Sequence, residues 1–236
     1  MEKQDLRERV WTTLETEGVN RFPYPPEGRI TNFAGAKAAA DGLADTDEWR
    51  AAETVKANPD APQLPVRRRA LRDGKTVYVA VPRLRDEEPF LKLDPAEIAD
   101  IDAATTISGS AKHGVPVGPD EMPHVDFIVA GSVAVAETGA RIGKGEGYSD
   151  LEFAVLRELD CVDDETTVAT TVHELQVVDD AEVTPDAHDV PLDLVVTPER
   201  TVRTETRYDR PGGVDWNALG AEKLAEIPVL QRLEPN

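Results

Sequence analysis

The chain has 236 residues, enough to bury a core in one large α/β domain or two small ones. Its 46 acidic residues against 26 basic ones give a formal net charge of -20, which argues against nucleic acid as a partner because the phosphates would be repelled. One cysteine, Cys161, excludes an internal disulfide and a cysteine-rich metal site, and we expect it to be a small packed residue.

An acidic surface of this kind keeps a protein hydrated in concentrated salt, where screening removes the self-repulsion. The composition therefore indicates a halophilic cytoplasm. Charge begins at Glu2 and no apolar run approaches about 18 residues, so we expect neither a signal peptide nor a membrane span.

The first part of the chain predicts helices separated by proline-rich connectors. Residues 3–17 place apolar side chains on one stripe of a helix. Lys3 and Arg7 share a face of that helix. The pair is either part of the solvated surface or a pair of cations that binds phosphate. Three further helices are expected, over residues 33–43 with Asn32 as cap, 47–53, and 66–73.

Residues 76–81 form a continuous apolar run of strand length that ends at Pro82, Arg83 and Arg85. A buried parallel strand would place these arginines at the carboxyl edge of a sheet, where ligand sites of α/β proteins form. The alternative is a solvated loop.

The remaining elements continue the alternation of strands and helices. We expect a short helix over 95–102 opened by Asp94, a loop or short strand over 105–110, strands over 125–130, 167–172 and 192–196, an edge strand over 202–207, and a C-terminal helix over 216–226. This order predicts an open, mainly parallel α/β sheet in a single domain over residues 1–236.

A glycine-rich stretch, residues 138–150, lies between the strand at 125–130 and a helix over 151–159. Glycines at 139, 143, 145 and 147 allow close approach of the backbone to a ligand, and the helix N-terminus favours an anion such as phosphate. Arg141 and Lys144 add positive charge in an otherwise acidic chain. The alternative is a glycine-rich surface turn, since neither common nucleotide-binding fingerprint is present.

Two carboxylates are candidates for a metal site beside this loop. Asp150, at the start of the helix, is either a helix cap or a ligand of Mg²⁺, which needs only one or two carboxylates in addition to phosphate and water. Asp189 could provide the second carboxylate. The four histidines lack metal-ligand spacing, and Ser132 is expected to be a small residue where a strand ends beside a ligand.

The stretch Arg141-Ile-Gly-Lys-Gly-Glu-Gly-Tyr-Ser-Asp150 resembles the R-L-G-x-G-x-G-Y-Y-D loop of 5-formyltetrahydrofolate cyclo-ligases, also called methenyltetrahydrofolate synthetases. Lys3-x-x-x-Arg7, Pro82-Arg83 and His188-Asp189 match the same family in order. The branch of methenyltetrahydrofolate synthetase domain-containing proteins is more similar still. Its strings K-Q-D-x-R-x-R-V-W, V-K-x-N-P-D-A-P-Q, G-S-V-A-V and R-I-G-K-G-E-G-Y-x-D-L-E extend the resemblance over nearly the full chain.

The resemblance implies a three-layer α/β fold of the NagB/RpiA/CoA-transferase type. It also implies the ATP- and Mg²⁺-dependent conversion of 5-formyltetrahydrofolate to 5,10-methenyltetrahydrofolate, with release of ADP and phosphate. The partner would be a reduced folate rather than nucleic acid or a membrane, and the protein would be a cytoplasmic monomer or small homo-oligomer.

The resemblance also assigns site residues. Lys3 and Arg7 would bind the ATP phosphates, Lys144 and Arg141 would be catalytic, and Asp150 and Asp189 would hold Mg²⁺. The nucleotide would be wrapped by Gly143, Lys144, Gly145, Glu146, Gly147 and Tyr148.

Three departures from the family fall on the substrate side. The family has a pterin-binding glutamate at the start of its second helix, near which this chain reads Asn32-Phe-Ala-Gly-Ala-Lys37. The family's P-G-x-x-F-D is replaced by Ala130-Gly-Ser-Val-Ala-Val135, and the second tyrosine of the loop is Ser149. Two alternatives therefore stay open: a paralogous ATP-dependent enzyme with a different, possibly thiamine-related, substrate, and a non-catalytic nucleotide- or folate-binding regulator.

Overall fold

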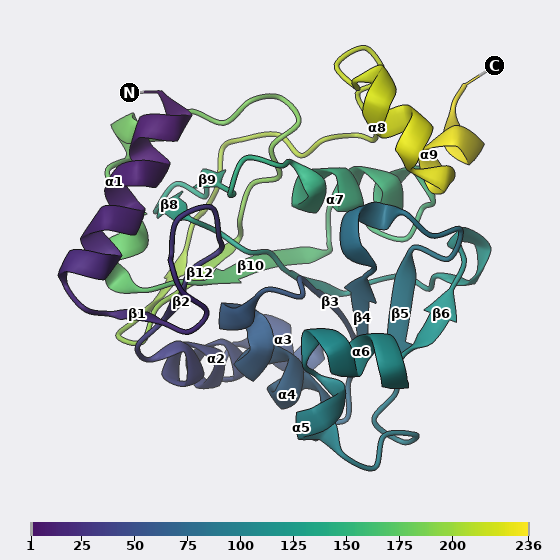
Figure 1. Ribbon diagram of the computed structural model, residues 1–236, viewed down its shortest axis with the longest axis horizontal. Helices are drawn as coiled ribbons and strands as arrows, with labels where there is room; N and C mark the ends of the chain where they lie inside the picture. The colour runs from purple at the N-terminus through teal and green to yellow at the C-terminus, as the bar shows by residue number, and fades with distance from the viewer. Residues whose placement is uncertain (1, 236) are drawn as a thin grey trace.

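The computed structural model describes residues 2–235 and is built around an eight-stranded sheet with the order β13-β12-β10-β7-β3-β4-β5-β6 (Figure 1). The strands from β12 to β4 are parallel, and β13, β5 and β6 extend the two edges in antiparallel pairs. The bounds are β3 Thr54–Ala57, β4 Thr76–Ala80, β5 Phe90–Leu93, β6 Val115–Val117, β7 Phe127–Val129, β10 Thr167–Thr171, β12 Leu194–Val196 and β13 Thr201–Arg203. The predicted mainly parallel α/β sheet is confirmed.

Helices cover both faces of this sheet, which gives three layers (Figure 1). One face carries α2 Ala36–Ala44, α3 Asp47–Ala51, α4 Leu64–Arg72, α5 Ile101–Ala104 and α6 Ile107–His113. The other carries α7 Tyr148–Glu158, α8 Ala221–Glu226 and α9 Pro228–Leu233. Short 3₁₀ helices span η1 Ala61–Gln63, η2 Pro82–Leu84, η3 Pro119–Glu121, η4 Glu174–Gln176 and η5 Asp180–Glu182. No helix among residues 2–235 is both long and apolar enough to cross a bilayer.

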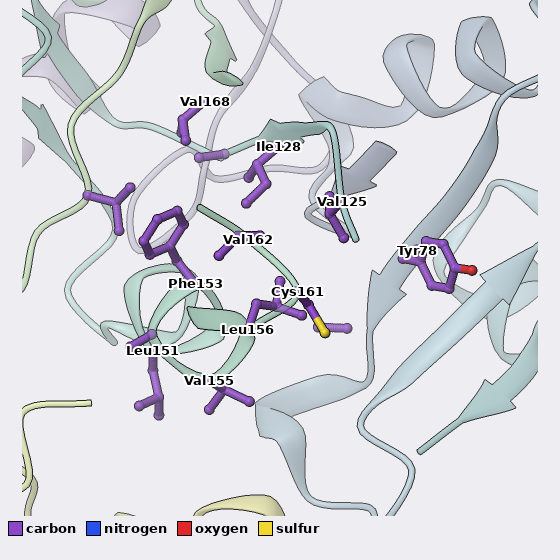
Figure 2. Packing of buried hydrophobic residues seen from close by; sticks show 14 of the residues in the cluster. Tyr78, Val125, Ile128, Leu151, Phe153, Val155, Leu156, Cys161, Val162 and Val168 are labelled. Atoms are coloured by element: carbon purple, nitrogen blue, oxygen red, sulfur yellow. The ribbon is translucent and has the colours of Figure 1, made fainter. Parts of the chain in front are cut away.

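Helix α7 is fixed to the sheet by an apolar face. Figure 2 shows Phe153 directed toward Ile128 of β7 and Val168 of β10, and all three side chains are buried. Cys161, just beyond this helix, is a buried residue of the same cluster, as expected. Packing of this kind holds the first turn of α7, which carries Asp150, against the carboxyl ends of the strands.

A small sheet joins the first helix, α1 Lys3–Thr16, to the rest of the molecule. Its strands, β8 Ala134–Ala136, β9 Arg141–Ile142 and β11 Val177–Val178, have the order β11-β8-β9. The predicted apolar stripe of α1, with Leu6 and Val10 buried, packs on this sheet. A separate pair, β1 Asn20–Arg21 and β2 Asn32–Phe33, follows α1.

The predicted helix over 33–43 begins later than expected, and Asn32 is not its cap. Residues 32–33 pair with β1, and the Asn32 amide donates to the carbonyl of Phe22 at 2.9 Å. The helix begins at Ala36 after Gly35, whose φ of 87° is a left-handed conformation that favours glycine. A Cβ at Gly35 would also come within 2.6 Å of Pro198, so a tertiary contact sets this boundary.

Two predictions between residues 94 and 113 were wrong. The Asp94 carboxylate accepts from the amide of Ala96 at 3.0 Å and forms a turn, so the expected helix over 95–102 is absent and α5 begins only at Ile101. The expected loop or strand over 105–110 is largely helix α6. Its cap is Thr106, whose hydroxyl accepts from the amide of Gly109 at 3.0 Å.

The predicted C-terminal helix over 216–226 is replaced by two short helices, α8 and α9. The central strand β3 was not predicted. Residues 216–220 are turns or irregular, α8 begins after Gly220, and α9 follows directly. The strands at 76–81, 125–130, 167–172 and 192–196 are confirmed with shorter bounds, and the edge strand at 202–207 is reduced to Thr201–Arg203.

Candidate functional site

A cavity of about 400 Å³ lies at the carboxyl ends of three neighbouring strands. Asn58 follows β3, Pro82 follows β4 and Gly131 follows β7, and all three line the cavity. The glycine-rich loop, residues 143–147, forms another wall with the first turn of α7. This is the edge of a parallel sheet at which α/β proteins bind their ligands.

The glycine-rich loop is held between a short strand and a helix. It follows β9 of the small sheet rather than the strand at 125–130, and α7 begins at Tyr148, three residues earlier than predicted. Gly145 has a φ of 104° and Gly147 a φ of 71°, conformations that L side chains rarely adopt. The glycines are therefore needed for the path of the chain, and the loop presents the N-terminus of an 11-residue helix to the site.

Helix α1 brings Arg7 to this loop and Lys3 to the segment that contains Asp189. Arg7 Nε donates to the carbonyl of Gly143 at 2.8 Å, and its guanidinium lies against Gly145. Lys3 Nζ donates to Asp189 at 2.6 Å and to Asp186 at 2.8 Å. Burial lowers the pKa of Arg7, whereas at Lys3 the hydrogen bonds to the two aspartates outweigh burial and raise the pKa. Both cations are therefore engaged in tertiary contacts, Arg7 with the loop and Lys3 with Asp186 and Asp189.

Asp150 is not the cap of α7. The cap position belongs to Gly147, and Asp150 Oδ1 instead accepts from the guanidinium of Arg141 and, at 2.9 Å, from the amide of Val190. Val190 directly follows Asp189, so this hydrogen bond holds the two predicted metal ligands in adjacent segments. Among the described residues no cluster of three or more histidine, cysteine or acidic side chains could hold a metal ion.

Arg141 lies beneath the loop and is 3 % exposed. Its second terminal nitrogen donates to the carbonyl of Gly131 at 3.2 Å, so the guanidinium joins the end of β7 to the Asp150 carboxylate. A buried, paired arginine is suited to orienting Asp150.

Lys144 and Glu146 lie on the more open side of the loop. Lys144 Nζ lies 2.8 Å from the Glu146 carboxylate, and both side chains are partly exposed. Tyr148 lines the same cavity, and Arg83 enters it from the end of β4. Arg85 instead pairs with Glu226 at 2.9 Å, so only the first of the two arginines faces the cavity.

Arg83 has an unusual backbone. Its φ is 60° and that of Leu84 is 53°, so two consecutive non-glycine residues are left-handed. Each such residue costs roughly 1–2 kcal/mol relative to ordinary backbone. Strain of this kind is concentrated at ligand sites, in keeping with the position of Arg83 on the cavity wall.

Four polar residues of the site were missed by the sequence analysis. Asp60 and Glu152 line the cavity, and Asn58 Nδ2 donates to Glu152 Oε2 at 3.1 Å. Lys56 of β3 forms a buried ion pair with the same Glu152 oxygen. Burial raises the pKa of Asp60, although Lys144 and other cations oppose the shift. The string V-K-x-N-P-D contains three of these residues, but no spacing rule marks it as a site.

The residues that depart from the family pattern do not all lie at the cavity. None of residues 32–37 lines the cavity; the carboxylate that lines it just before a helix is Asp60. Ser149 also lines it and donates to Asn58 Oδ1 at 3.2 Å. Ser132 is buried, with its hydroxyl 2.9 Å from that of Thr170, and it does not line the cavity, so the structure does not place it beside a ligand as expected.

Comparison with known proteins identifies the family. The family model described as the 5-formyltetrahydrofolate cyclo-ligase family matches residues 2–198. Methenyltetrahydrofolate synthase domain-containing proteins of Mus musculus and Bos taurus are 42% and 41% identical over 234 residues, which is 98% of this chain. The chain spans only about three fifths of their length, 63% and 61%.

A solved structure supports the same fold. The 5,10-methenyltetrahydrofolate synthetase of Aquifex aeolicus superposes with a TM-score of 0.55 at 21% identity, covering 93% of this chain and 100% of that one. The match over residues 2–198 includes α1, the glycine-rich loop and Asp189. The chain therefore belongs to the 5-formyltetrahydrofolate cyclo-ligase family of enzymes.

Proposed function

We propose that the protein converts 5-formyltetrahydrofolate to 5,10-methenyltetrahydrofolate with ATP and Mg²⁺. The formyl oxygen takes the γ-phosphoryl group, the anilino nitrogen attacks the activated carbon, and phosphate leaves with the former formyl oxygen. Phosphoryl transfer of this kind depends mainly on positioning and on neutralisation of charge. The observation that carries the proposal is that the glycine-rich loop lines the cavity at the N-terminus of α7, while Arg7 of α1 donates to the carbonyl of Gly143 in that loop.

The loop and its cations would hold the triphosphate. The amides of residues 143–147 and the N-terminus of α7 favour an anion, and Arg7 and Lys144 supply charge. Lys144 lines the cavity, so its ammonium is suited to follow the phosphoryl group during transfer. Glu146 would then exchange its contact with Lys144 for one with bound ligand or water.

Asp150 and Asp189 fit the needs of Mg²⁺. They are hard oxygen donors on adjacent segments, and Asp150 Oδ2 accepts no hydrogen bond from any of residues 2–235. Two carboxylates suffice because Mg²⁺ completes its coordination with phosphate oxygens and water. Arg141 would keep Asp150 ionised and oriented, and Lys3 would do the same for Asp189.

The cavity would receive the reduced folate. Ile30, Val81, Pro82 and Ile107 give it apolar surface for a flat heterocycle. Asp60 is a carboxylate without an ion pair within 4 Å among the described residues, and a pterin presents N–H donors that a carboxylate can accept. We therefore assign Asp60 to recognition of the pterin.

A paralogous enzyme is the second candidate. The specific observation in its favour is the polar network of Lys56, Asn58 and Glu152 at the cavity wall. A different carbonyl or amide substrate could use these groups while the ATP site stays the same.

One assay separates these two candidates from each other and from a non-catalytic regulator. Purified protein in molar KCl is mixed with 5-formyltetrahydrofolate, ATP and Mg²⁺, and absorbance is followed at the methenyltetrahydrofolate band. The cyclo-ligase predicts product that disappears in the Lys144→Ala variant. No product, with ATP binding still measurable by calorimetry, favours the paralogue; ATP binding without any turnover on other substrates favours a regulator.

A further inference from the structure

A second cavity, of about 360 Å³, lies on the other side of the glycine-rich loop. It shares Gly147 and Asp150 with the first cavity, so the two meet at the proposed phosphate site. Leu151 and Ala154 of α7 form one wall, and an opposite wall comes from residues 213–223.

That opposite wall lies outside the family match, which ends at residue 198. The segment is nevertheless fixed to the site. The amide of Val214 donates to Glu158 of α7 at 3.0 Å, and a Cβ at Gly213 would come within 2.4 Å of the same carboxylate. Lys223 of α8 donates to the carbonyl of Glu146 at 2.9 Å and lies 5.1 Å over the ring of Tyr148. The C-terminal segment thus holds the glycine-rich loop directly.

The lining of the second cavity suits a neutral, flat ring rather than phosphate. Val214, Leu219 and the two α7 residues give it a mainly apolar wall. Besides the shared Asp150, its charged and polar side chains are His188, Lys223, whose ammonium already donates to the carbonyl of Glu146, and the carboxylates of Asp215 and Glu222. These carboxylates would repel a phosphate and accept hydrogen bonds from an exocyclic amine.

We propose that this cavity binds the adenine base of ATP, with the C-terminal segment as one wall of the nucleotide site. The inference rests on the proposed ATP dependence. A nucleotide would lie with its base in the second cavity, its phosphates on residues 143–147, and its γ-phosphate toward the first cavity and the substrate. Lys223 would join the base side to the phosphate side by holding the loop.

The test compares ATP with inorganic tripolyphosphate, which has the phosphates but no base. Ala218→Trp fills the second cavity from an exposed position, and Ala225→Trp, exposed on α8 and outside the cavity, is the matched control. Binding of both ligands is measured by calorimetry with Mg²⁺ in molar KCl. We expect Ala218→Trp to weaken ATP at least about tenfold, or ~1.4 kcal/mol, and to leave tripolyphosphate unchanged. The control should match wild type.

Two results would overturn this inference alone. If Ala218→Trp binds ATP as wild type does, the base lies elsewhere. If it loses both ligands equally, the cavity acts through the phosphate loop and not through a base. Failure of the wild-type protein to bind either ligand would instead overturn the proposed ATP dependence itself, and the inference with it.

Discussion

Arg7 Nε donates a hydrogen bond of 2.8 Å to the carbonyl of Gly143, joining α1 to a loop 136 positions later in the chain. The contact explains why a helix at the very start of the chain belongs to the site. The guanidinium lies against Gly145, so the loop and the cation are positioned together.

Arg7→Ala should therefore weaken ATP binding by about tenfold or more. The variant loses a positive charge beside the phosphates and also the hydrogen bond that holds the loop in place. Arg9→Ala on the same helix is the control, since Arg9 pairs with Glu182 away from the loop. Calorimetry gives the affinities and circular dichroism checks the fold. Equal affinities for the two variants would remove Arg7 from the nucleotide site.

Asp150→Asn should abolish Mg²⁺-dependent ATP binding while the protein stays folded. It should also lower the free energy of unfolding by about 1–3 kcal/mol, because the buried guanidinium of Arg141 loses its charged partner. Asp160→Asn, just beyond the C-terminal end of α7, is the control. ATP binding is compared with Mg²⁺ and with EDTA. If Mg²⁺ still strengthens ATP binding in Asp150→Asn, Asp150 serves only as the ion-pair partner of Arg141.

Asp60→Asn should make the protein more stable but unable to bind the folate. Burial raises the pKa of Asp60 above its unfolded value, so its stabilising contribution is present at low pH and is lost as pH rises through the raised pKa. At neutral pH the charge is therefore unfavourable, and its removal should stabilise the fold by roughly 1 kcal/mol.

The pH dependence of thermal unfolding should be weaker in Asp60→Asn than in wild type, and binding of 5-formyltetrahydrofolate should be lost. Asp86→Asn, in an exposed loop, is the control. A variant that binds folate normally would contradict the pterin-binding role of Asp60.

The buried pair Lys56–Glu152 should be sensitive to loss of either partner. Lys56→Ala or Glu152→Ala leaves an uncompensated buried charge, which costs about 3–5 kcal/mol. The double variant Lys56→Met with Glu152→Leu should recover most of this loss. Urea unfolding measures all three, with the partly exposed pair Lys92–Asp94 as the control. Single variants as stable as wild type would contradict the expected cost of leaving either buried charge without its partner.

The acidic surface should make stability depend on salt. A net charge of -20 repels itself at low ionic strength, and salt screens this repulsion. We expect the Tm to rise continuously from about 0.1 M to molar KCl, with partial unfolding at the low end. Full stability at the lowest salt would contradict the halophilic interpretation.

The sequence predicted the elements whose apolar patterns are long and uninterrupted. The stripe of α1 and the β-branched runs of β4 and β10 are of this kind. Strand β3 was missed because Lys56 interrupts its apolar run, and that lysine is tolerated in the core only through Glu152, a partner 96 positions away. The start of α2 was misplaced for a similar reason, since Pro198, far along the chain, leaves no room for a side chain at Gly35.

Some parts of the candidate site could likewise be predicted from the sequence and others could not. The glycine-rich loop before a helix could be predicted because glycine spacing has a local meaning in the sequence, whereas phosphate binding there stays a prediction. The position of Asp60 at the cavity could not be predicted, because it depends on burial and on the proximity of Lys144, a residue far along the chain. The second cavity depends on Lys223 and residues 213–219, whose contact with α7 has no sequence signature.

The most direct test of the cyclo-ligase chemistry follows the formyl oxygen. 5-Formyltetrahydrofolate labelled with ¹⁸O in the formyl group is converted with ATP and Mg²⁺ in molar KCl, and the released phosphate is analysed by mass spectrometry. The proposed mechanism predicts one labelled oxygen in each phosphate, released in step with methenyltetrahydrofolate. Unlabelled phosphate would contradict transfer of the phosphoryl group to the formyl oxygen, and with it the function assigned to Lys144 and the loop.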